Sequence, residues 1–175
     1  MTEKMERSAV KLLLVGFSGS GKSTVLEELR RRYPASFVHY IDLDRLVAPE
    51  GAASFVDRHG WAAFRDAEVA TLTEQLRGAD PVVVALGAGA WERALAVVRG
   101  RSDVRSCHLA APFERCWQRL ARDPQERPLA REGEAAMRAL FEERAPLYAQ
   151  ADFRVDATRP PGEVALAIAQ TLGLA

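Results

Sequence analysis

The feature that most constrains this chain is a glycine-rich stretch near its start, Gly16-Phe17-Ser18-Gly19-Ser20-Gly21-Lys22-Ser23-Thr24. It follows an apolar run at 10–15, which predicts a buried parallel strand. It precedes a helical pattern at 25–33 whose apolar residues share one face. Glycine, four residues and then Gly-Lys-Ser, set between a strand and a helix, form the phosphate-binding P-loop. The stretch therefore predicts a site for a nucleoside triphosphate.

Each residue type in this loop has a physical role in holding phosphate. Glycines permit positive φ and let backbone N–H groups close around phosphate oxygens, while the helix that follows turns its positive end to the same anion. The Lys22 ammonium can bridge the β- and γ-phosphates, and the Ser23 hydroxyl can ligate Mg²⁺. The residues expected to hold the nucleotide are Gly19, Ser20, Gly21, Lys22, Ser23 and Thr24.

Length and composition narrow the class of protein. At 175 residues the chain fits one domain, and its 24 basic and 24 acidic residues cancel, which argues against a nucleic-acid or anionic-membrane partner. The polar N-terminal segment lacks the apolar stretch of a signal peptide, and no apolar run is long enough to span a bilayer. Cys107 and Cys116 share no metal spacing and are expected to be reduced structural thiols. We expect a cytoplasmic monomer that acts on a small molecule.

The rest of the chain alternates short apolar runs with helical patterns. Further strands are predicted at 36–41, 82–86, 104–109 and 153–155, and further helices at 61–76, 90–98, 112–121, 134–148 and 161–172. Between Arg45 and Arg58, Pro49 and Gly51 predict short helical pieces. Strands that alternate with helices predict parallel βαβ units with helices on both faces of one sheet, so we expect a single α/β domain over 1–175.

Polar and small residues follow the predicted strands where a ligand would lie. Asp42 and Asp44 follow the second strand, and Gly87 and Gly89 follow the third. Ligands of such sheets bind beyond the carboxyl ends of the strands. Two carboxylates two residues apart on a strand end point the same way, so one can hold Mg²⁺ through water while the other accepts a proton from an attacking hydroxyl. Alternatively, one of them caps the following helix.

Several arginines are candidate ligands for anions. Arg65 precedes Glu68 by three residues, which also fits a surface ion pair on a helix. Arg144 lies on a charged helix, where a solvated face would explain it equally well. Arg122 and Arg127 lie in a charged break with two prolines, which suits either a lid that closes over the nucleotide or an exposed loop.

Together these motifs occur in an order that resembles the shikimate kinase family over roughly Val10 to Leu172. The matching segments are the P-loop, Asp42-Leu-Asp44, Phe64-Arg65-Asp-Ala-Glu68, Leu86-Gly-Ala-Gly89, Arg127-Pro-Leu, Arg144-Ala-Pro-Leu-Tyr148 and Val155-Asp156. The resemblance implies a three-layer P-loop kinase fold of the nucleoside-monophosphate-kinase type, with a central five-stranded parallel sheet. It also implies a mobile lid at about 122–133 and a substrate-binding lobe at about 44–70.

The activity implied by the resemblance is transfer of the γ-phosphate of ATP to the 3-hydroxyl of shikimate, a small cyclic carboxylate. Roles carry over by position. The implied catalytic residues are Lys22, Asp44 and Arg127, and Arg127 and Arg159 would also contact the nucleotide. The implied metal ligands are Ser23 and, through water, Asp42. The acceptor would contact Asp44, Arg65, Gly87, Ala88, Gly89 and Arg144, with the two arginines on its carboxylate.

This chain departs from the family on the acceptor side. The family usually ends its third strand in Thr-Gly-Gly-Gly, whereas this chain has Leu86-Gly87-Ala88-Gly89. Ala88 adds a methyl and restricts φ, and Leu86 removes a hydroxyl near the expected Mg²⁺ site. The stretch from Asp44 to Arg65 is also a few residues shorter than usual, and the break between Arg122 and Arg127 is compact. Two alternatives therefore remain: a kinase for another hydroxylated acid, such as a gluconate-like sugar acid, and a non-catalytic nucleotide-binding module.

Overall fold

The computed structural model describes residues 11–34, 38–122 and 131–172. Its helices and strands, in chain order, are β1 Lys11–Val15, α1 Lys22–Arg32, β2 His39–Asp42, α2 Leu43–Val47, α3 Ala52–Gln75, β3 Val82–Ala85, α4 Trp91–Val98, β4 Val104–Ala110, α5 Phe113–Leu120, α6 Glu134–Tyr148, β5 Phe153–Asp156 and α7 Pro161–Thr171. Strands and helices alternate as the hydrophobic pattern predicts.

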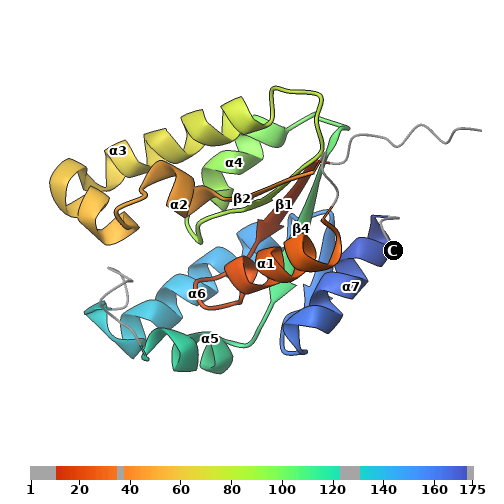
Figure 1. Ribbon diagram of the computed structural model, residues 1–175. Helices are drawn as coiled ribbons and strands as arrows, with labels where there is room; N and C mark the ends of the chain where they lie inside the picture. Colours follow the sequence, from red (N-terminus) through yellow and green to blue (C-terminus); the bar gives the residue numbers. More distant parts are fainter. Residues whose placement is uncertain (1–10, 35–37, 123–130, 173–175) are drawn as a thin grey trace, which may run out of the picture.

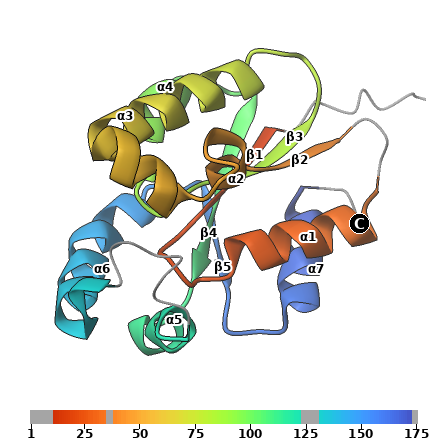
Figure 2. The ribbon, with the colours of Figure 1, turned by 60° about the vertical axis from the view of Figure 1, so that its left-hand side comes forward.

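The five strands form one parallel sheet in the order β2-β3-β1-β4-β5 (Figure 1). Helices cover both faces, so the predicted three-layer α/β architecture is confirmed (Figure 2). β1 is the central strand, and Leu12, Leu13 and Leu14 are fully buried because both faces of the sheet are covered. The P-loop therefore extends from the central, buried strand of the sheet.

Two hydrophobic cores flank the sheet. On one face, Leu12 and Leu14 pack with apolar residues of α1 and α7. On the other face, Leu13 packs in a cluster that includes Leu72 of α3 and Trp91 of α4, together with residues of α5 and α6. Alternate side chains of β1 thus pack into opposite cores, because successive side chains of a strand point to opposite faces of the sheet.

Two local expectations were wrong in detail. Helix α1 begins at Lys22 rather than Val25, because Gly21 adopts a left-handed conformation (φ 99°) that starts the helix directly after the loop. Asp44 does not extend a strand, because β2 ends at Asp42 and Asp44 lies inside the short helix α2. The short helical pieces expected after Arg45 are present as α2 and the first part of α3, but α3 then continues past a bend at Gly60 (φ 81°).

Several other expectations can be compared with the described part of the chain. Most of the predicted lid at about 122–133, including Arg127, lies outside it, as does the start of the predicted strand at 36–41. Cys107 and Cys116 are buried free cysteines. Within the described residues, no helix has the length and apolar character needed to span a bilayer.

Candidate active site

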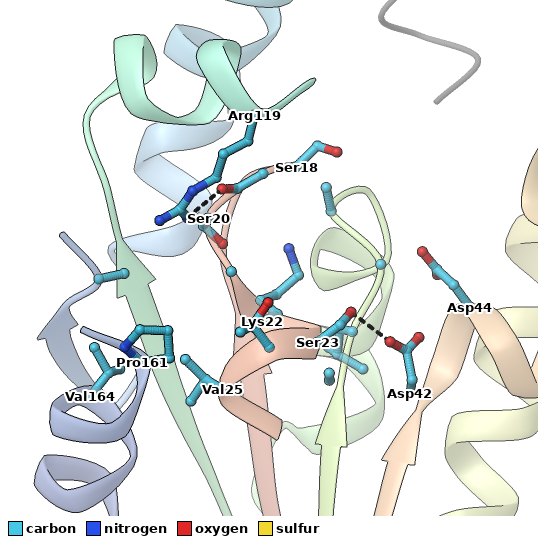
Figure 3. Close-up of a pocket in the computed structure, with 18 of the residues that line it drawn as sticks. Ser18, Ser20, Lys22, Ser23, Val25, Asp42, Asp44, Arg119, Pro161 and Val164 are labelled. Carbon is cyan, nitrogen blue, oxygen red and sulfur yellow. Dashed lines mark hydrogen bonds between the residues drawn. The ribbon is translucent and has the colours of Figure 1, made fainter. Parts of the chain in front are cut away.

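A cavity of about 380 Å³ lies at the carboxyl ends of β1, β2 and β3 (Figure 3). The P-loop and the start of α1 form its floor, and Asp42 and Asp44 lie at one side together with the turn after β3. Arg119 of α5 and the segment from Arg159 to Val164 line the opposite side. Most of the residues expected to contact the nucleotide therefore line this one cavity.

The P-loop has the backbone geometry that phosphate binding requires. Gly19 and Gly21 have φ values of 80° and 99°, in the region that favours glycine. No acidic residue belongs to the first turn of α1, so the helix itself supplies no carboxylate that would offset its positive end. Lys22 is 9% exposed, and its ammonium group donates to the carbonyl oxygens of Gly16 and Phe17 at 2.7 and 3.0 Å. The loop thus places a cation and a helix N-terminus at one anion site.

Ser23 and Asp42 form a hydroxyl–carboxylate pair beside this loop. The Ser23 Oγ donates to Asp42 Oδ2 at 2.6 Å, while Asp42 Oδ1 accepts from the backbone N–H of Arg45 at 3.4 Å (Figure 3). Asp42 therefore caps α2 with one oxygen and accepts from Ser23 with the other. The helix-cap alternative is confirmed, and the role of Asp42 in holding Mg²⁺ stays a prediction. No group of three or more His, Cys, Asp or Glu residues in the described part of the chain could hold a metal ion. A hydroxyl and one carboxylate fit Mg²⁺, which keeps waters and takes its remaining ligands from substrate phosphates.

The carboxyl group of Glu68, which the sequence analysis did not assign to the site, lies next to Asp44. Glu68 of α3 is 1% exposed, and a Cβ added to Gly87 would clash with Asp44 Oδ1 and Glu68 Oε1 together. Burial raises the pKa of Glu68 to about 7, the Asp44 carboxylate adds to this rise, and the Arg65 guanidinium opposes it. Gly87 therefore leaves room for two carboxyl groups to approach each other.

Two guanidinium groups meet at the next glycine. A Cβ added to Gly89 would clash with Arg65 and would lie 3.0 Å from Arg144 Nη2. Arg65 does pair with Glu68, at 2.5 Å, but the pair is buried rather than on the surface, since its side chains are 16% and 1% exposed. The Arg65 guanidinium also lies 5.1 Å from the centre of the Trp61 ring. Two convergent cations of this kind suit one carboxylate.

The turn at 86–89 accommodates both departures from the family pattern. Ala88 has no positive φ, and its carbonyl accepts a hydrogen bond from the Tyr148 hydroxyl at 2.7 Å. Leu86 is 2% exposed and packs in the core. Neither Gly87 nor Gly89 needs a positive φ, so these glycines serve close approach by side chains rather than backbone freedom.

Sequence patterns missed three residues that shape this site. Arg119 donates to the Gly19 carbonyl at 2.8 Å, so α5 holds the P-loop from above (Figure 3). Tyr148 is buried beneath the turn, with the pKa of its hydroxyl raised to about 12 chiefly by burial. Glu68 was identified as the partner of Arg65 and as part of a segment that matches the family, but it was given no role in the site. Spacing along the chain carries no signal for Arg119, whose contact depends on where α5 packs.

Comparison with protein families gives one clear match. The shikimate kinase family model matches residues 18–173. The shikimate kinase of Synechococcus sp. (strain JA-3-3Ab) is 38% identical over 161 residues, covering 87% of this chain and 82% of that protein.

Solved structures agree with this match. A shikimate kinase from Acinetobacter baumannii in complex with shikimate superposes with a TM-score of 0.83 and 25% identity, covering 98% of this chain and 97% of that one. A gluconokinase from Sinorhizobium meliloti gives a TM-score of 0.65 at 19% identity and shows a shared fold alone. From its motifs, its fold and these matches, the chain belongs to the shikimate kinase family.

Proposed function

We propose that this protein transfers the γ-phosphate of ATP to the 3-hydroxyl of shikimate. The observation that carries the proposal is the convergence of Arg65 and Arg144 on Gly89, next to the Asp44 carboxyl group and across from the P-loop. The site thus combines an anion cradle, a carboxylate and a pair of guanidinium groups. The acceptor bound in the A. baumannii structure is named as shikimate, which supports the same acceptor here.

On the nucleotide side, the triphosphate lies along the P-loop backbone. Lys22 leaves the carbonyl groups of Gly16 and Phe17 for the β- and γ-phosphate oxygens, where it offsets the charge that develops during transfer. Arg119 and Arg159 line the cavity at the end away from Asp44, where the rest of the nucleotide extends. Arg127, which lies outside the described residues, is the proposed lid contact to the phosphates.

On the acceptor side, the two arginines orient the substrate through its carboxylate. Bidentate contacts from Arg65 and Arg144 fix the ring so that one hydroxyl faces Asp44. Asp44 accepts the proton of that hydroxyl as its oxygen attacks the γ-phosphorus, and the bond to the β-phosphate oxygen breaks. Glu68 keeps Arg65 in place through their buried ion pair. The backbone at Gly87, Ala88 and Gly89 forms the wall behind the acceptor.

We further propose that Ser23 and Asp42 hold the Mg²⁺ that accompanies ATP, Ser23 directly and Asp42 through water. When bound, the ion would offset part of the negative charge of the phosphates during transfer.

All of the residues proposed for the site belong to one chain, so a monomer with a single P-loop kinase domain suffices. The predicted substrate-binding lobe corresponds to α2 and α3. The use of ATP fits a cytoplasmic location.

The alternatives have less support. A gluconate-like acid would also place a carboxylate between the arginines, but the gluconokinase likeness shows the fold alone, whereas the family match and the curated relative are shikimate kinases. A non-catalytic module would need neither Asp44 nor the arginine pair.

The test is an ADP-release assay with purified protein, Mg²⁺ and ATP, in which shikimate, quinate and gluconate are compared as acceptors. We expect ADP release to depend on shikimate and to be abolished in Lys22→Ala. Asp44→Asn should lower kcat at least a hundredfold while nucleotide binding persists, because the general base is lost. Turnover with gluconate but not shikimate would refute the proposed acceptor, and unchanged turnover in Asp44→Asn would refute the proposed base.

A further inference from the structure

A second cavity lies behind the P-loop, on the face of the sheet that α6 covers. Its volume is about 640 Å³, against about 380 Å³ for the cavity on the nucleotide side, and lies within the range of small-molecule sites. The P-loop, the carboxyl ends of β4 and β5, and α6 supply its walls. Of the residues assigned above to nucleotide or acceptor, only Ser20 lines it.

The edge strand β5 places a cation and a carboxylate side by side along this cavity. Arg154 and Asp156 are two residues apart, so both project from the same face of the sheet, beside His108 and Ala110 of β4. The two are not ion-paired with each other, and the Arg154 guanidinium makes no hydrogen bond to any residue that the structure describes. Asp156 Oδ1 accepts from the N–H and the hydroxyl of Thr158, at 2.9 and 2.6 Å, which leaves Oδ2 for another donor.

The inner end of the cavity is polar but uncharged. His108 stacks on Tyr148 with ring centres 5.3 Å apart, and burial, Arg154 and Lys22 together lower its pKa to about 4, so the imidazole is neutral at physiological pH. Ser20 is 1% exposed, and its Oγ has no hydrogen-bond partner among the residues the structure describes. A ligand here would therefore meet a hydroxyl and a neutral ring.

An apolar wall faces these polar groups. Phe17 of the P-loop and Phe141 of α6 meet edge to face with ring centres 5.1 Å apart, and both line the cavity. The small side chains of Ala145 in α6 and Ala149 just after it also line the cavity. The wall therefore suits an aromatic or aliphatic group next to the charged pair on β5.

We propose that this cavity binds a zwitterionic α-amino acid with an apolar side chain. The α-carboxylate pairs with Arg154, the α-ammonium group donates to Asp156 Oδ2, and the side chain packs against Phe17 and Phe141. A simple carboxylate would leave Asp156 without its cation, and a simple amine would leave Arg154 without its anion. Because both charged groups are exposed and screened by water, the dissociation constant should be on the order of 1 mM.

The test is isothermal titration calorimetry of the full chain with L-phenylalanine, in the presence of saturating shikimate. We expect 3-phenylpropionate, which lacks the ammonium group, and phenethylamine, which lacks the carboxylate, to bind at least about tenfold more weakly. Arg154→Gln should weaken L-phenylalanine binding by a similar factor. Arg105→Gln is the matched control, because Arg105 is an exposed arginine on the opposite face of β4, where it lies over Phe153.

Three results would overturn the proposal. They are no binding at about 10 mM L-phenylalanine, equal binding of 3-phenylpropionate, and a loss of binding in Arg144→Ala with none in Arg154→Gln, which would move the ligand to the acceptor site. None of these measurements involves phosphoryl transfer, so their outcome is independent of whether the proposed kinase activity is confirmed.

Discussion

The carboxylate clamp can be tested by adding one methyl group, in Gly89→Ala. The added Cβ would lie 2.7 Å from Arg65 Cζ and 3.0 Å from Arg144 Nη2, whereas ordinary contacts begin at 3.4 Å. Both guanidinium groups must therefore move away, and Arg65 must move farther than Arg144, because its atoms lie nearer to the added Cβ. Gly89 has no positive φ, so the alanine itself strains no backbone.

The size of the effect follows from what Arg65 can do. Its guanidinium is held by the buried Glu68 carboxyl group at 2.5 Å and lies over the Trp61 ring, so it cannot shift and keep both contacts. Misalignment of charge-assisted hydrogen bonds to the acceptor carboxylate should cost about 2–3 kcal/mol. That corresponds to a KM for shikimate raised roughly 30- to 150-fold.

The assay is steady-state ADP release with shikimate varied at saturating ATP, then ATP varied at saturating shikimate. The KM for ATP should stay within about twofold of wild type, because Gly89 does not line the nucleotide-side cavity. Gly78→Ala is the matched control, since its added Cβ would meet only the Asp80 nitrogen, at 3.9 Å. A thermal melt of each variant shows that folding is preserved.

One outcome would refute the reasoning. If Gly89→Ala keeps its melting temperature and its KM for shikimate stays within about threefold of wild type, the two arginines do not hold the acceptor carboxylate. An equal rise in both KM values would instead show a general distortion of the site, which also contradicts the clamp.

Three further predictions follow from the same contacts. Glu68→Gln should remove a pH-dependent contribution to stability: since the pKa of Glu68 is raised from 4.5 to about 7, about 3 kcal/mol is fully present below pH 4.5 and lost as pH rises through 7. Denaturant unfolding should therefore show the wild-type advantage over the variant shrinking as pH rises, and a constant advantage would contradict this. Arg119→Ala should raise the KM for ATP about fivefold without changing the KM for shikimate, because Gly19 loses its contact to α5. A KM for ATP equal to that of the wild type would contradict this prediction. Tyr148→Phe should lower the free energy of unfolding by about 1–3 kcal/mol, since the Ala88 carbonyl loses its donor, and urea denaturation that shows no loss would disprove it.

Local patterns in the sequence were sufficient for the fold class. A continuous apolar run marks a strand covered on both faces, and β1 and β3 are such strands. Alternation with helices then implies a parallel sheet, because parallel strands need long crossovers. The predicted ends of helices and strands were wrong where one residue belongs to two elements. Asp42 is an example, because it ends β2 and caps α2.

The acceptor side could be predicted only in part. Arg65 with Glu68 fits a surface ion pair by spacing, and only packing of α3 against the sheet buries that pair beside Asp44. The glycines at 87 and 89 look like an ordinary turn, and their need for space appears only when side chains from α2, α3 and α6 meet them.

The sequence by itself determined the P-loop, because strand, glycines, lysine and helix start are contiguous and their geometry is local. The left-handed glycines and the buried β1 follow directly from those residues. Only the tertiary structure decided what surrounds the loop. Segments far apart in the chain supply Arg119, which contacts the loop, and Arg65 and Arg144, which lie across from it. Distant segments also line the cavity behind the loop. Their positions depend on how helices pack against the sheet, and no spacing in the sequence records that packing.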